Sequence, residues 1–138
     1  MKTNCTATLY NHYTNPDTER TAYKRTVIKN VNWQECQKTS VTEKGLLSAN
    51  QINVFIPFQA DFEGREYIGP KEFKRLSEED KDKYFTFAND DYIVKGEIDE
   101  NLTVDTLKKK YDNVVTIISV LICDNGSPSI RHFEIGAK

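Results

Sequence analysis

The chain has 138 residues, of which 38% are apolar and 29% charged, and its formal net charge is −2. A charge so close to zero gives no electrostatic reason to expect a nucleic acid or a membrane surface as a partner. The sequence has no run of the roughly 20 apolar residues that cross a bilayer, and its first residues lack the apolar stretch of a secretory signal.

The first part of the chain predicts three strands. Residues 5–13 alternate between apolar and polar side chains, as an opening strand does. Residues 23–33 are rich in Thr, Val and Ile, and their mixed faces are typical of an exposed ribbon or an edge strand. Residues 34–50 are polar and weakly patterned, which predicts a loop. Residues 51–58 alternate most clearly, with apolar side chains at every second position.

A loop and helix insertion is expected at about residues 59–83. Pro70 suits the first position of a short helix, because its missing N–H group costs little there. Ser77 precedes an acidic turn and predicts an N-cap. The acidic residues that follow it alternate with lysines, which favours a solvated helix face over a calcium-binding loop.

Three aromatic residues of this insertion, Phe62, Tyr67 and Phe73, follow no core periodicity. A contiguous exposed patch of them would mark a contact with another protein, so they are the candidate protein-contact residues. The alternative is that they fold back and cover the core of the domain. The sequence alone leaves both interpretations open.

Downstream, residues 84–87 and 92–98 predict the two strands of a hairpin with a turn between them. Thr103 is expected to cap a helix over residues 104–111. Apolar residues lie on one stripe of this helix, and three lysines fill its last turn, where positive charge suits the helix dipole.

The run from Val114 to Cys123 is apolar apart from two small polar residues, and turn residues flank it on both sides. Branched side chains favour a strand, and the pattern predicts the most buried strand of the protein, covered on both faces. Asn125-Gly126 predicts a turn in which the glycine has positive φ. Residues 130–135 alternate as a closing strand, with His132 and Glu134 on its solvated face.

These elements predict a mainly β fold, in which strands outnumber helices and most connections have the length of hairpins. We expect residues 1–138 to form a single β-rich domain, a small antiparallel β-barrel or sandwich with one or two short helices. The three cysteines, Cys5, Cys36 and Cys123, are far apart and lack CxxC spacing. Free buried thiols in a reducing cytosol are therefore expected.

No set of residues in the sequence has the spacing of a catalytic, cofactor-binding or metal-binding motif. His12 and His132 lack the neighbours of HxH or HExxH motifs, which favours structural or surface roles over metal binding. A Cys36–His132 pair would have the residue types of a nucleophile and its base, but nothing else in the sequence supports it. We therefore expect no enzymatic activity, no cofactor and no metal.

Six segments together resemble small, uncharacterised proteins of bacteriophages and prophages of Gram-positive bacteria. They are TLYNHY, YKRTVIKNVNW, GLLSANQINVFIPF, DYIVKGEI, KKYDNVVTIISV and DNGSPSIRHFEIGAK, and they span most of the chain. The order of the parts is also similar to that of phage head–tail connector proteins of the stopper or head-closure type. Proteins of that type are small β-barrels with an insertion, and they assemble into a ring below the portal. The loop over residues 34–50 and the helix near 103–111 depart from that layout.

The resemblance implies a non-enzymatic structural protein of the virion that completes the head–tail connection. Such a protein is made in the cytoplasm of the bacterial host and then built into the virion. Its implied partners are further copies of itself in a ring and the neighbouring head and tail proteins. The alternative is a soluble, monomeric binding protein, encoded by a prophage, that acts on a host protein.

Overall fold

The structure is a computed structural model that describes residues 3, 5–15, 17–42, 45–100 and 104–138; for 36–50 and 104 only the backbone is described. The elements, in chain order, are β1 (Cys5–Thr14), β2 (Thr21–Thr42), β3 (Gly45–Pro57), β4 (Glu66–Tyr67), α1 (Pro70–Arg75), α2 (Glu78–Lys81), β5 (Tyr84–Phe85), β6 (Tyr92–Lys95), α3 (Val104–Lys110), β7 (Val114–Cys123), the 3-10 helix η1 (Pro128–Ile130) and β8 (His132–Ala137).

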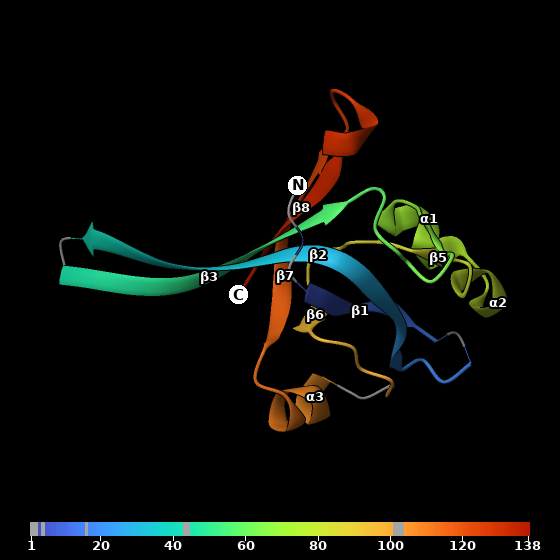
Figure 1. The fold of residues 1–138 in the computed structure, drawn as a ribbon. Helices are drawn as coiled ribbons and strands as arrows, with labels where there is room; N and C mark the ends of the chain where they lie inside the picture. Colours follow the sequence, from blue (N-terminus) through green and yellow to red (C-terminus); the bar gives the residue numbers. More distant parts are fainter. Residues whose placement is uncertain (1–2, 4, 16, 43–44, 101–103) are drawn as a thin grey trace.

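Six strands close into a barrel in the order β1-β2-β3-β8-β7-β6, and every neighbouring pair is antiparallel (Figure 1). The expected mainly β, antiparallel fold is confirmed, and of the two architectures left open it is the barrel. Over residues 23–31, β2 pairs with β1, and its pairing with β3 begins only at Asn32; an isolated bridge between Lys29 and Asp61 lies on that other edge. This stretch therefore has the edge character that the sequence predicts, although Thr26, Val27 and Ile28 are buried rather than exposed.

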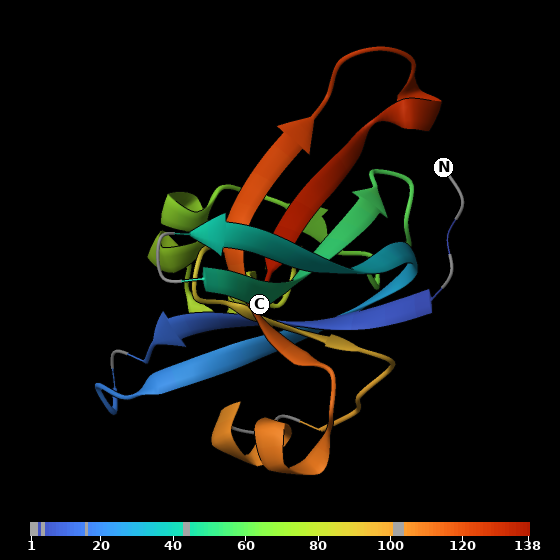
Figure 2. The same ribbon diagram turned by 90° about the vertical axis from the view of Figure 1, so that its left-hand side faces the viewer.

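β1 contains a continuous run of buried residues, from Ala7 to Asn11. Its apolar side chains join a core that also takes residues from β2, β3, β5, β6, β7 and β8. A second, smaller cluster packs α3 onto the barrel through Leu107, Tyr10 and Val94. The core therefore lies inside the barrel, with α3 as a separate cover on one side (Figure 2).

β7 is a strand as predicted, but the prediction that it is the most buried one is wrong. Val115 and Ile117 are buried, whereas Ile118 and Leu121 are 46% and 58% exposed. The pairing with β8 shifts between Ile117 and Ser119, so Ile118 is the extra residue of a bulge. A bulge reverses which side chains face the core, and β7 beyond it runs past the closed part of the barrel.

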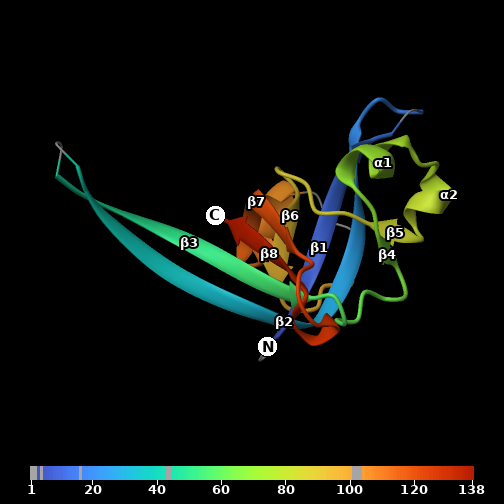
Figure 3. The same ribbon diagram turned by 90° about the horizontal axis from the view of Figure 1, so that it is seen from above.

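Residues 34–42 and 45–50 are strands, which contradicts the predicted loop. They belong to β2 and β3, which pair without interruption from Asn32 opposite Phe55 to Thr42 opposite Gly45. β8 pairs with β3 only over Ile52–Pro57, so the rest of this hairpin has no third strand in the described ladders. We call residues 36–42 and 45–51 the arm, which extends away from the barrel (Figures 1 and 3).

The segment between β3 and β6 covers one end of the barrel. β4 and β5 pair in parallel, and α1 and α2 lie between them in the chain. The expected hairpin of residues 84–87 and 92–98 is therefore wrong: β5 pairs with β4, whereas β6 pairs with β1 and β7. The expected N-cap at Ser77 is confirmed, since its side chain accepts a hydrogen bond from the Asp80 N–H group.

The connection between β7 and β8 contains η1 and is longer than the two-residue turn that Asn125-Gly126 predicts. Gly126 does have the predicted positive φ, at +88°. The expected cap of α3 at Thr103 lies outside the described residues. Within the part of the chain that the structure describes, no helix has the length and apolar character needed to cross a membrane.

Candidate functional site

An aromatic cluster lies at the end of the barrel that the segment between β3 and β6 covers. Phe62 stacks on Phe85 with 4.5 Å between ring centroids, and Tyr67 lies 4.9 Å from Phe133. Phe58 adds a third contact, with its centroid 4.7 Å from that of Phe133. These rings, with Arg65 and Asp124 among others, line a hollow of about 480 Å³. The cluster thus closes the barrel but leaves a concave apolar surface.

The three candidate protein-contact residues do not form one exposed patch. Phe73 is 1% exposed, so it belongs to the interior beneath α1. Phe62 and Tyr67 are half-buried and pack against the barrel core. The sequence left open whether these residues form an exposed contact patch or cover the core. Phe73 is buried and belongs to the interior. Phe62 and Tyr67 cover the core and also line the hollow.

Exposed apolar residues gather instead on β7 and on its connection to β8. They are Ile118, Leu121, Ile122 and Ile130. This part of the β7–β8 hairpin extends from the barrel on a different side from the arm (Figure 2). We call these four residues the β7 strip. Leu121 and Ile122 are consecutive in the strand and therefore lie on its opposite faces, with Ile122 at the lining of the hollow. Large exposed apolar side chains on a projecting hairpin are typical of a protein contact.

A buried polar network holds β1 to the chain before β6. The Asp91 carboxylate is 1% exposed and accepts hydrogen bonds from the Asn11 side chain at 2.8 Å and from the N–H groups of His12 and Ala88. The His12 ring also contacts this carboxylate. The hydrogen bond to Asp91 raises the pKa of His12, against an opposing effect of burial. Every partner is internal, so this network has a structural role.

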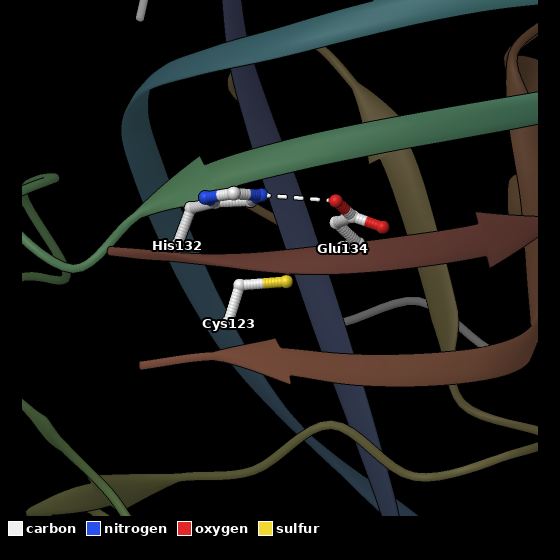
Figure 4. Close-up of side chains that lie close together, drawn as sticks. All are labelled: Cys123, His132 and Glu134. Carbon is white, nitrogen blue, oxygen red and sulfur yellow. Dashed lines mark hydrogen bonds and ion pairs between the residues drawn. The ribbon is translucent and has the colours of Figure 1, made fainter. Parts of the chain in front are cut away.

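A second group of titratable side chains lies on the outside of the barrel, where β7 and β8 pair. Cys123 is opposite His132, and Glu134 follows two residues later on the same face of β8 (Figure 4). The thiol sulfur, a ring nitrogen and a carboxylate oxygen all lie within 4.8 Å of one another. We call these three residues the Cys-His-Glu cluster.

Hydrogen bonds fix the imidazole of this cluster. His132 Nδ1 lies 2.7 Å from the Ile130 carbonyl oxygen, and Nε2 lies 3.0 Å from Glu134 Oε1. The bond to Ile130 raises the pKa of His132, burial opposes it, and Glu134 raises it further. Burial raises the pKa of the Cys123 thiol, and the Glu134 carboxylate adds to this effect.

Sequence reasoning identified two of the three residues of this cluster as neighbours and missed the third. Alternation placed His132 and Glu134 on one face, which the structure confirms. The only cysteine that the sequence analysis considered beside His132 was Cys36, for which nothing beyond the residue types spoke; the side chain of Cys36 lies outside those described. Cys123 is the cysteine beside His132, and it is a free thiol, as is Cys5.

A comparison with protein-family models matches residues 2–138 to a family of unknown function (DUF6751). Because the match covers almost the entire chain, the chain belongs to this family. No curated protein and no solved structure matches the chain.

Proposed function

We propose that this member of the DUF6751 family is a non-enzymatic structural protein of a phage particle that assembles as a ring at the head–tail connection. The resemblance of its segments to phage and prophage proteins supports the proposal that it is part of a phage particle. The projecting arm supports the mode of action, which is contact with further copies and with neighbouring head and tail proteins. The protein would be made in the bacterial host cytoplasm and then built into the virion.

The arm is the observation that carries the proposal. From Cys36 opposite Gln51 to Thr42 opposite Gly45, the two strands pair with each other and with no third strand in the described ladders. At about 3.3 Å per residue this ribbon reaches roughly 20 Å. An isolated two-stranded ribbon is marginally stable in water, and both of its edges have free backbone groups. A neighbouring subunit that pairs with an edge would stabilise the arm.

The β7 strip provides a second contact surface on another side of the barrel. A ring needs two different surfaces on each subunit, because each copy contacts its neighbours in a head-to-tail manner. The arm and the β7 strip meet this requirement, since they project in different directions (Figure 2). A monomer in dilute solution is compatible with this function, because a preformed ring of partners offers many weak contacts at once.

The experiment deletes the gene from its phage and restores it on a plasmid in three forms. One form is wild type. In a second, Asn-Gly replaces residues 38–49, which joins Gln37 to its partner Asn50 by a two-residue turn and removes most of the arm. In a matched control, Asn-Gly replaces only residues 43–44, which keeps the arm. The readout is the number of infectious particles.

We expect the wild type and the control to restore infectious particles and the arm-shortened form to fail, although it folds with unchanged unfolding free energy. Full restoration by the arm-shortened form would contradict the role of the arm. Infectious particles formed without the gene would contradict the structural function and favour a monomeric prophage protein that binds a host protein.

A further inference from the structure

We propose that Cys123, His132 and Glu134 form a binding site for a zinc ion on the outer surface of the barrel. The three side chains come from two paired strands, so the backbone that carries them is held by the β7–β8 ladder (Figure 4). The strands place a thiol, an imidazole and a carboxylate together without any loop. This use of the Cys-His-Glu cluster is independent of the proposed ring assembly.

The separations are close to those that a shared ion requires. Zinc lies about 2.3 Å from sulfur and about 2.0–2.2 Å from nitrogen or oxygen, so tetrahedral ligands are roughly 3.3–3.8 Å apart. The cluster atoms lie within 4.8 Å of one another, and the His132–Glu134 pair is at 3.0 Å. Rotations of partly exposed side chains, with shifts of about 1 Å, bring all three onto one ion.

The imidazole is already in the tautomer that binds a metal. A carbonyl oxygen only accepts hydrogen bonds, so His132 Nδ1 carries a proton and donates it to the Ile130 carbonyl. Nε2 is then the ring atom that faces Glu134 Oε1, which is an acceptor. Two acceptors at this distance need a proton or a cation between them. A second hydrogen bond of this kind, to a carbonyl, is what orients most zinc-binding histidines.

The ligand types select the metal. A thiolate with an imidazole suits zinc, whereas magnesium and calcium prefer oxygen ligands only. Ionised Cys123 and Glu134 carry two negative charges, which a divalent cation balances. Phe55 packs beside the His132 ring with 6.0 Å between centroids, which restricts the ring on its other side. Three protein ligands leave the fourth zinc position open to solvent or to an added ligand.

The test is a titration of the purified full-length protein with Co²⁺, followed by competition with Zn²⁺. We expect one ion per chain and the near-ultraviolet absorption of a thiolate bound to cobalt, which Zn²⁺ abolishes. Cys123→Ser should remove this absorption and weaken binding at least tenfold. His132→Gln and Glu134→Gln should each weaken binding while the thiolate absorption is reduced or shifted.

The matched controls are Cys5→Ser and Cys36→Ser, which remove the other two thiols and should leave the cobalt spectrum unchanged. Circular dichroism is the check that each variant is folded, which we expect because the three ligands are only half-buried. A wild-type protein that binds no cobalt at micromolar metal would overturn the proposal. Equal binding by Cys123→Ser and wild type would overturn it as well.

Discussion

Two adjacent isoleucines of β7 give the sharpest test of the fold, because the bulge places them in opposite environments. Ile117 is 0% exposed and belongs to the barrel core, whereas Ile118 is the bulged residue and is 46% exposed. Truncation of a fully buried isoleucine to alanine costs about 2–5 kcal/mol through lost burial and the cavity that remains. We therefore expect Ile117→Ala to lower the unfolding free energy by about 3 kcal/mol or more.

For Ile118→Ala we expect a loss below about 1 kcal/mol, because substitutions at exposed positions rarely cost more. The contrast is larger with aspartate: Ile117→Asp buries an unpaired charge and should prevent folding, whereas Ile118→Asp should give a folded protein. Urea denaturation, followed by tryptophan fluorescence or circular dichroism, measures both variants. Equal losses for the two alanine variants, or unfolding of Ile118→Asp alone, would refute the register of β7.

Three further predictions concern single positions. Gly126→Val should lower the unfolding free energy by about 1 kcal/mol or more, because Gly126 has φ of +88° and an added Cβ would lie 2.6 Å from Ile130 Cδ1; unchanged urea stability would count against this turn. Asp91→Ala should cost about 3 kcal/mol or more, since one buried and two partly buried donors lose their acceptor; a loss below 1 kcal/mol would contradict the network. The pKa of His12 is raised above 6.5, so its stabilising contact with Asp91 is fully present below that pH and is lost as the pH rises through the raised pKa. His12→Gln should flatten this part of the pH profile of stability, and a wild-type profile no steeper than that of the variant would exclude the effect.

The sequence identified most strands because alternation and turn residues are local signals. It could not reveal the bulge at Ile118, because the run Val114–Cys123 is apolar on both faces. A bulge changes which positions face the core, and a uniformly apolar run has the same sequence pattern with or without that change. The same uniformity made the whole run look buried. In the exposed half of β7, Val120 still packs against the core and Ile122 lines the hollow, whereas Ile118 and Leu121 are exposed.

Residues 34–50 were interpreted as a loop because a ribbon without a core to cover shows no alternation. Pairing along the arm depends on backbone hydrogen bonds and on continuation from the barrel strands, neither of which requires an apolar face. The edge-strand interpretation of residues 23–33 fits the ladders, because β2 pairs with β1 up to Val31 and with β3 only from Asn32.

The candidate site was less accessible to sequence reasoning than the fold. Phe62 and Tyr67 were singled out correctly as unusual, but only the tertiary structure shows that they cover the barrel end and line its hollow. The Cys-His-Glu cluster depends on the register across a connection of eight residues, 124–131, for which no sequence rule fixes the pairing.

The central claim is that the protein is part of a phage particle, and its most direct measurement is the copy number of the protein in particles purified from the host strain that carries the gene. Quantitative mass spectrometry gives the number per particle, and gold-labelled antibodies viewed by electron microscopy give the position. We predict several copies per particle, all at the head–tail junction, as a ring requires. Infectious particles that contain no copy of the protein would contradict the account.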